Sequence, residues 1–216
     1  LRCVLLNRLS GPLPEIINDV TVKVKKTDPT QFRISEQEFE RFLDASANTP
    51  WFQALLAISY DTGCRQGEIR GCKIKDFKQD KYTGLLRVDG KTGERMVRLA
   101  YSHRYVIDQI NRLPNDDNGW LFPAITKPEK SVSSGLVSYH FNKVRQKTGY
   151  ERIEKGRWPV KMHSFRHNRA TIVAEKGWNE QMMREYFGWS KGSDMPSHYT
   201  HINRRALDAA IFKSQG

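Results

Sequence analysis

Six side chains in this sequence have types that could bind and act on a phosphate group. Arginine presents a planar fork of donors that fits two phosphate oxygens, histidine and lysine can transfer a proton, and a tyrosine hydroxyl can attack phosphorus. The residues concerned are Arg65, Lys91, His163, Arg166, Trp189 and Tyr199. Taken singly, each is a weak indication, because such residues are most often solvated charges or half-buried packing.

The setting of Arg65 strengthens its case. This arginine follows a turn at Asp61-Thr62-Gly63, its neighbours Cys64 and Gly67 are small, and Glu68 lies three residues on. A carboxylate at that spacing can hold the guanidinium still in a buried ion pair. We therefore expect Glu68 to support Arg65.

The other candidates each have a plain alternative. His163 and Arg166 are three residues apart, so on a helix they project from one face and can reach one phosphate. They could equally be a structural histidine beside a surface arginine. Lys91 falls in the turn sequence 90–93, where lysines often serve solubility, and Tyr199 is one of eight tyrosines.

Mostly helical elements must position these residues. A capping box at Ser35 and Glu38 predicts a helix that begins there, and the apolar run 51–58 predicts a second helix that ends near Gly63. Alternating apolar residues over 85–100 predict a β-hairpin. Helical spacing returns at residues 106–113, 137–144, 163–176, 179–187 and 207–211. The expected fold class is α+β, mainly helical, with one small antiparallel sheet.

Composition indicates a folded, basic protein. The chain has 36 Lys and Arg against 24 Asp and Glu, a formal net charge of +12, and 38% hydrophobic residues. Such a charge attracts polyanions, most commonly nucleic acid, although it does not separate DNA from RNA or anionic lipid. The apolar stretches are too short to span a membrane. Three cysteines without a Cys-x-x-Cys spacing favour a reducing compartment.

Several further assignments follow from local patterns. Residues 1–32 read as a linker or lead-in, and the chain begins with Leu1, so we expect a fragment or a processed chain. Cys64, Cys72 and His103 fit no standard zinc spacing, so we expect no metal. Basic residues before His163 are candidate DNA contacts or a solvated basic face. They are Lys143, Arg145, Lys147, Arg152, Lys155 and Arg157.

Five motifs taken together, in this order, resemble the catalytic domain of the tyrosine recombinases, the phage-integrase family. The motifs are Thr62-Gly63-Cys64-Arg65-Gln66-Gly67-Glu68-Ile69, Gly90-Lys91-Thr92-Gly93-Glu94-Arg95, His163-Ser164-Phe165-Arg166-His167, Gly188-Trp189 and Tyr199-Thr200-His201. The resemblance covers about residues 33–212, and the stretch 189–196 is most similar to archaeal virus and plasmid integrases.

The resemblance implies a specific reaction. In this family a tyrosine, here Tyr199, attacks a DNA phosphodiester, forms a 3'-phosphotyrosyl link and frees a 5'-hydroxyl without metal or nucleotide cofactor. Arg65 and Arg166 would meet the negative charge of the transition state. His163 would hydrogen-bond the same phosphate or assist proton transfer, and Lys91 would protonate the departing 5'-oxygen.

Two features depart from the family pattern. Trp189 stands where histidine is usual; its indole donates one hydrogen bond but cannot serve as an acid or base. The interval from Trp189 to Tyr199 is one residue longer than in the bacterial pattern. Tyr186 is a competing tyrosine, which we interpret as core packing because it precedes the Gly-Trp step.

The resemblance also implies partners and domain organisation. Full-length members carry an N-terminal helical domain, so residues 1–32 would connect to that missing DNA-binding module and residues 33–216 would form the catalytic domain. The expected partner is double-stranded DNA with an attachment site, bound by a homotetramer that is monomeric when free. The segment from Asn203 onward would pack on its own domain or on a neighbour. We expect a cytoplasmic protein of a prokaryotic host, archaeal in the finer assignment.

Three alternatives to DNA strand exchange stay open. A type IB topoisomerase shares the chemistry but relaxes supercoils as a monomer. A DNA-binding relative could keep the scaffold without catalysis, although the intact residue set argues against it. An RNA-binding module driven by charge lacks a recognisable aromatic RNA platform.

Overall fold

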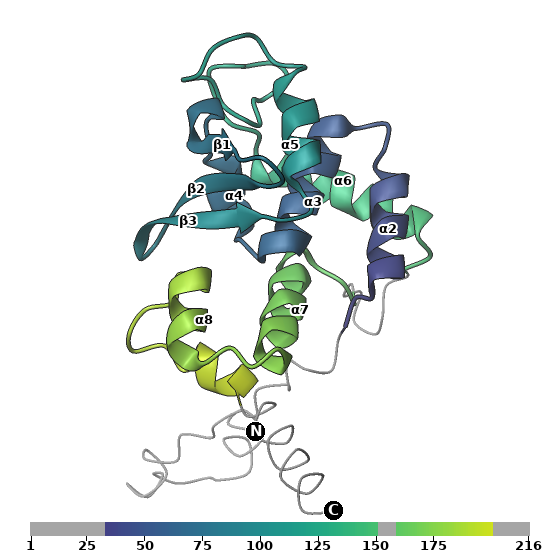
Figure 1. The fold of residues 1–216 in the computed structure, drawn as a ribbon. Coiled ribbons are helices and arrows are strands. Elements are labelled where there is room, and N and C mark those ends of the chain that lie inside the picture. The colour runs from purple at the N-terminus through teal and green to yellow at the C-terminus, as the bar shows by residue number, and fades with distance from the viewer. Residues whose placement is uncertain (1–32, 151–158, 201–216) are drawn as a thin grey trace, which may run out of the picture.

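A computed structural model describes residues 33–150 and 159–200 of the chain. The helices and strands, in chain order, are α2 (Glu36–Ala45), α3 (Pro50–Thr62), α4 (Gln66–Arg70), the 3-10 helix η3 (Ile74–Asp76), β1 (Phe77–Gln79), β2 (Gly84–Gly90), β3 (Gly93–Leu99), α5 (His103–Ile110), α6 (Ser134–Lys147), α7 (Met162–Glu175) and α8 (Glu180–Phe187). Helices predominate and the strands form one small antiparallel sheet, which confirms the expected fold class (Figure 1).

The helix ends follow the sequence signals. Ser35 caps α2 through its side chain, and Glu38 returns a bond to the Ser35 backbone, which confirms the capping box. Helix α3 is buried from Ala54 to Ser59 and ends at Gly63, whose φ of 66° is left-handed. This conformation suits glycine because it has no Cβ. The turn that precedes Arg65 is therefore set by local chemistry.

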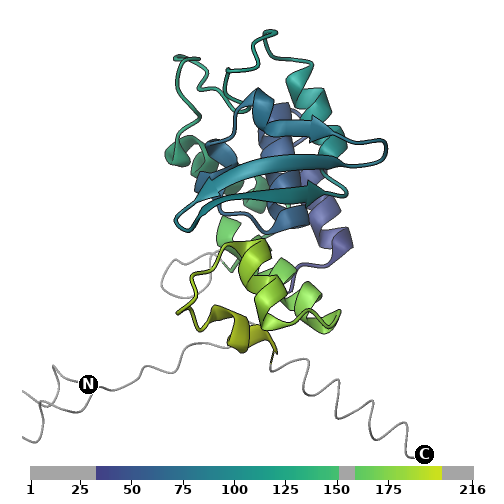
Figure 2. The same ribbon diagram turned by 60° about the vertical axis from the view of Figure 1, so that its left-hand side comes forward.

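The sheet contains the predicted hairpin and one further strand. Strands β2 and β3 pair from Gly84↔Leu99 to Gly90↔Gly93, so Lys91 and Thr92 form a two-residue tip. Leu86 and Val97 are fully buried, because alternate residues face the helices. Strand β1, which the sequence pattern did not reveal, adds only three residues along β2. Figure 2 shows the sheet lying across one side of the helices.

Two hydrophobic clusters stabilise the described part of the chain. The larger joins α2, α3, the sheet and α6, and includes Phe165 from α7. The smaller contains apolar residues of α7 and α8 together with Trp189 and Tyr199. In both ribbon views α7 and α8 lie together below the sheet and the other helices (Figures 1 and 2). The hairpin tip and the start of α4 face the junction between the two clusters.

Two predicted segments lie outside the described residues, and one helix of the structure was not predicted. The lead-in at 1–32 and the last helix at 207–211 lie outside the described residues. Helix α4 was not expected, because five residues are too few for a hydrophobic period to show. Within residues 33–150 and 159–200, no helix is both long and apolar enough to cross a membrane.

Candidate active site

Glu68 is the centre of a buried ion-pair network. Its carboxylate accepts bonds from Arg65, through Nη1 at 2.8 Å and the backbone nitrogen at 2.8 Å. Arg95 adds bonds at 3.2 Å to Oε1 and 2.8 Å to Oε2. Burial alone would raise the pKa of Glu68, but the hydrogen bonds from Arg95 and Arg65 outweigh it and lower that pKa. The predicted Arg65–Glu68 pair is confirmed, and Arg95 joins it.

Arg166 is held almost entirely inside the protein. Its Nη1 donates to the carbonyl of Gly63 at 3.0 Å and its Nη2 to that of Phe187 at 2.6 Å. The guanidinium also lies over the Trp189 ring, 5.3 Å from its centroid. Burial first, and then the charge of Arg65, lower the pKa of Arg166 to about 10, so it stays charged at neutral pH. A fixed cation therefore stands at the floor of the site.

Tyr199 is buried against Trp189. The two rings are stacked, with centroids 5.8 Å apart and planes 7° apart, and only 1% of Tyr199 is exposed. The Tyr199 hydroxyl is hydrogen-bonded to Nδ1 of His167. Burial raises the pKa of Tyr199, although the charge of Arg166 opposes the rise. The hydroxyl is thus protonated and held in place.

His163 stands one helical turn before His167 on α7. The two rings meet edge to face, with centroids 4.7 Å apart. His163 keeps an exposed edge, yet the surrounding protein removes enough solvent to lower its pKa to about 4, helped by the charges of His167, Arg166 and Arg65. The imidazole is neutral at pH 7 and can donate or accept a hydrogen bond.

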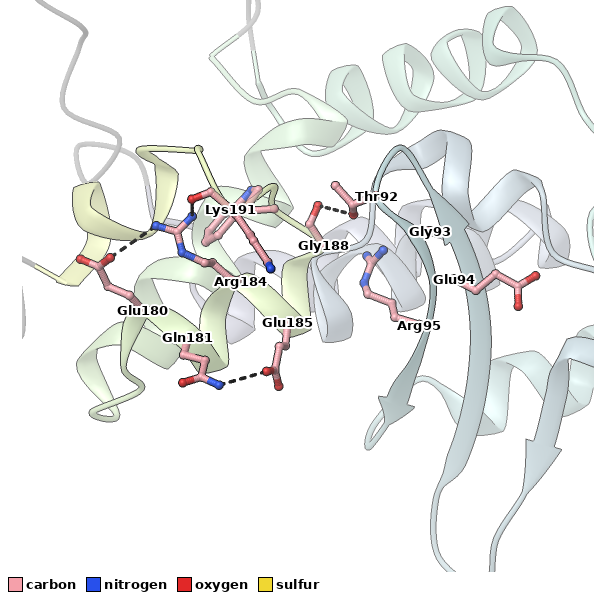
Figure 3. Close-up of a pocket in the computed structure, with 11 residues that line it drawn as sticks. Thr92, Gly93, Glu94, Arg95, Glu180, Gln181, Arg184, Glu185, Gly188 and Lys191 are labelled. Carbon is pink, nitrogen blue, oxygen red and sulfur yellow. Dashed lines mark hydrogen bonds and ion pairs between the residues drawn. The ribbon is translucent and has the colours of Figure 1, made fainter.

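Hydrogen bonds join the hairpin tip and strand β3 to the end of α8. Thr92 Oγ1 donates to the carbonyl of Gly188 at 3.1 Å, and Arg95 Nε donates to the carbonyl of Tyr186 at 2.9 Å. Figure 3 shows the tip and α8 facing each other across a cavity. This cavity, about 740 Å³ in volume, is separate from the one that holds the predicted catalytic residues. These bonds fix the tip that carries Lys91, whose own side chain is exposed.

One cavity of about 380 Å³ collects all the predicted catalytic side chains. Arg65, Lys91, His163, Arg166, Trp189 and Tyr199 line it. They come from five separate stretches of sequence, and Tyr199 lies in the cavity of its own chain. His167 lines the same cavity, and Arg95 is hydrogen-bonded to Glu68, the partner of Arg65. Sequence reasoning assigned no role to either residue, although both fall inside quoted motifs.

The remaining candidates lie away from this cavity. Tyr186 packs against Trp178 and Phe187, in agreement with the packing interpretation. Arg145 is only 5% exposed and donates to the carbonyl of Val160 at 2.6 Å, so it is not presented to DNA, contrary to the expectation. Lys143 and Lys147 are exposed. The other expected DNA contacts, Arg152, Lys155 and Arg157, lie outside the described residues.

The two cysteines within the described residues face inward. Cys64 and Cys72 are both buried free thiols, and burial raises the pKa of each. The Cys72 thiol donates to the backbone carbonyl of Glu68. Over the part of the chain that the structure describes, no three His, Cys, Asp or Glu side chains are grouped so as to hold a metal ion.

Comparison with known families assigns the domain. Residues 33–205 match the phage integrase family, which is most of the chain. The chain belongs to that family. A probable integrase/recombinase of Methanocaldococcus jannaschii is 25% identical over 202 residues, covering 89% of this chain and 58% of the relative. The tyrosine recombinase XerC of Natranaerobius thermophilus is 27% identical over 186 residues, covering 81% of this chain and 59% of the relative.

Solved structures support the same fold for this phage integrase family member. The crystal structure of the XerH site-specific recombinase, bound to a palindromic difH substrate, superposes with a TM-score of 0.62 at 22% identity. The match covers 85% of this chain and 53% of that one. The chain spans a little over half the length of the relatives it matches.

Proposed function

We propose that this chain is the catalytic domain of a site-specific DNA recombinase that cuts and rejoins strands through a 3'-phosphotyrosyl intermediate. The observation that carries the proposal is the convergence of six residues, from five stretches of sequence, on one cavity. Membership of the phage integrase family and the likeness to tyrosine recombinases support it.

Two arginines provide the charge that the reaction needs. Attack on a phosphodiester concentrates negative charge on the non-bridging oxygens, and fixed cations stabilise that charge most when they need no reorganisation. Arg166 is fixed by the carbonyls of Gly63 and Phe187, and Arg65 by Glu68. Both guanidiniums line the cavity where the phosphate would lie. His163 would donate to the same phosphate.

Tyr199 would be the nucleophile and Lys91 the general acid. The stacked Trp189 ring orients the phenol, and Arg166 favours the phenolate. As the phosphorus–oxygen bond to the 5'-side breaks, the departing oxygen needs a proton, which an ammonium group can give. The hairpin tip places Lys91 at the lining of the cavity.

The partner would be duplex DNA with an attachment site, bound by four copies of the whole protein. The net charge of +12 supports a polyanionic partner. Residues 1–32 would link this domain to an N-terminal DNA-binding domain, as in longer family members. Lys143 and Lys147 are the described members of the expected phosphate-contacting set that remain exposed.

A suicide-substrate assay tests the proposal. The chain is incubated with nicked duplex DNA carrying a candidate attachment site, in EDTA, and products are separated under denaturing conditions. We expect a covalent protein–DNA adduct from the wild type and none from Tyr199→Phe, which lacks only one hydroxyl.

Tyr186→Phe is the matched control, because it removes the same atom from a tyrosine of α8 that packs against Trp178 and Phe187 outside the cavity. It should form the adduct at the wild-type rate. An adduct that persists in Tyr199→Phe, or that requires a divalent metal, would refute the proposed chemistry.

A further inference from the structure

We propose, on the basis of the function above, that His167 is an additional catalytic residue that accepts the proton of the Tyr199 hydroxyl during attack on DNA. Nδ1 of His167 is hydrogen-bonded to the Tyr199 hydroxyl. The proposal rests on that contact, on the burial of the phenol and on the separate placement of His163.

The geometry aims the hydroxyl at His167. Trp189 stacks on one side of the Tyr199 ring, and the hydroxyl is bonded to Nδ1 of His167 at the ring's end. The His167 ring centroid lies 6.2 Å from that of Tyr199, with the planes tilted by 35°. The pKa of Tyr199 is raised and that of His167 is lowered, so we assign the protonated phenol as the donor and the neutral Nδ1 as the acceptor of this hydrogen bond.

The two histidines of α7 occupy different positions relative to the cavity. His163 has an exposed edge, whereas His167 is half-buried beneath it with its Nδ1 on the phenol. A phosphate in the cavity would reach His163 from the open side. His163 is therefore suited to a phosphate oxygen, and His167 to the nucleophile.

Burial and a nearby positive charge favour the unprotonated form of His167. Burial first, and then the charge of Arg166, lower the pKa of His167 below its ordinary value of 6.5. The other titratable groups facing it are His163, Tyr199, and Arg65 and Lys91 across the cavity. A bound phosphate would oppose these cations and raise the pKa of His167, which makes it a stronger proton acceptor when DNA is present.

The step conserves atoms and electrons. The Tyr199 oxygen forms a bond to phosphorus while its proton passes to Nδ1 of His167, and the bond from phosphorus to the 5'-oxygen breaks. Lys91 gives its proton to that 5'-oxygen. In the rejoining step the 5'-hydroxyl attacks phosphorus and gives its proton back to neutral Lys91. The bond from phosphorus to the Tyr199 oxygen breaks, and the proton held by His167 returns to that oxygen.

Two DNA substrates that differ in the leaving atom distinguish the role of the general acid, Lys91, from that of the general base, His167. Cleavage rates are measured on nicked DNA with an ordinary 5'-oxygen and with a bridging 5'-sulfur, which leaves without a proton. On the oxygen substrate, His167→Gln and Lys91→Ala should each be slower by about 10² to 10⁴-fold. On the sulfur substrate Lys91→Ala should recover and His167→Gln should stay slow, with a rate that rises as hydroxide replaces the missing base.

The matched control is His140→Gln. His140 is a partly buried histidine on α6 that packs against Trp51, and burial lowers its pKa too. Its substitution should leave both rates unchanged. Wild-type cleavage by His167→Gln would overturn the proposal, and so would its recovery on the sulfur substrate, which would place His167 with the leaving group. Absence of any adduct from the wild type would instead refute the proposed function.

A measurement on the free protein tests the contact without DNA cleavage. Nitrogen-15 NMR of the imidazoles should show His167 with an unprotonated Nδ1 at pH 7. In Tyr199→Phe the pKa of His167 should rise, because the lost hydrogen bond stabilised its neutral form. An unchanged His167 titration, or a proton on Nδ1 in the wild type, would overturn the assignment of His167 as acceptor.

Discussion

The cavity has two parts that are built differently: an arginine half around Arg65 and Arg166, and a tyrosine half around Tyr199. The arginine half is tied by ion pairs and carbonyl bonds that join α3, α4, β3, α7 and the end of α8, with Glu68 between Arg65 and Arg95. Among the described residues, the tyrosine half rests on a small hydrophobic cluster, the stacked Trp189 ring and a hydrogen bond to His167. The cations proposed to stabilise charge are therefore fixed by polar bonds from several elements, whereas the proposed nucleophile is held mainly by apolar packing.

Breaking the arginine half at its centre should have the largest effect. Glu68→Gln leaves the guanidinium of Arg95 buried without a counter-charge, and loss of one partner of a buried pair costs about 3 to 5 kcal/mol. Urea unfolding at pH 7 measures this free energy. A loss below about 1 kcal/mol would show that Arg95 finds water or another acceptor.

The same variant should change the pH dependence of stability. Because the pKa of Glu68 is lowered in the folded protein, its contribution is present above the ordinary value of 4.5 and is lost as pH falls through the folded value. Wild-type stability should therefore fall in acid below pH 4.5, and Glu68→Gln should lack that part of the loss. Parallel acid titrations of both proteins would contradict this account.

Replacing the fixed cation itself should affect the rate more than DNA binding. Arg166→Lys keeps a positive charge but loses the fork that bonds the carbonyls of Gly63 and Phe187. Cleavage should slow by about 10² to 10³-fold, as for loss of one preorganised donor. Single-turnover cleavage and gel-shift binding, measured side by side, separate rate from affinity. Equal losses in both would place Arg166 in DNA binding alone.

Adding a single methyl group at Gly188 should disturb its contact with the hairpin tip and lower both stability and the cleavage rate. Gly188 has a φ of 59°, and a Cβ there would lie 2.8 Å from Arg95 Nη1 and 3.2 Å from Thr92 Oγ1. Gly188→Ala should cost about 1 kcal/mol of stability and slow cleavage by displacing the hairpin tip. Gly192→Ala is the control, because nothing lies within 4 Å of its Cβ. Equal behaviour of the two variants would refute the close packing.

The smallest effect is expected at the tether of the tip. Thr92→Val keeps the shape of the side chain and removes the hydrogen bond to Gly188. A net hydrogen bond of about 0.5 to 1.5 kcal/mol predicts a cleavage rate about 2 to 10-fold lower, if the bond holds Lys91 in place. Single-turnover cleavage on the 5'-oxygen substrate measures this. A wild-type rate would show that Lys91 needs no tether.

Much of the fold could be predicted from local signals. The capping box at Ser35, the glycine end of α3 at Gly63 and the hairpin around Lys91 each depend on neighbouring residues, so the sequence displays them. Helix α4 and strand β1 were missed because five and three residues are too short for a period to appear.

The site residues that the sequence did not reveal are defined by contacts between residues that are far apart in the chain. Arg95 reaches Glu68, 27 positions away, because the register of the hairpin places it there. His167 meets Tyr199 across 32 positions, so the sequence alone did not show that these two side chains are in contact. Arg145 looked like a surface charge, and its burial depends on the carbonyl of Val160. Arg65 and Glu68 were paired correctly because they are neighbours on one short helix.

The most direct test of the central claim is to locate the attached phosphate. The trapped protein–DNA adduct is digested with a protease and a nuclease, and the modified peptide is sequenced by mass spectrometry. We expect a nucleotide remnant on the oxygen of Tyr199, linked through a 3'-phosphate. A remnant on Tyr186 or any other residue, or a 5'-phosphate linkage, would contradict the assignment of this cavity as the active site.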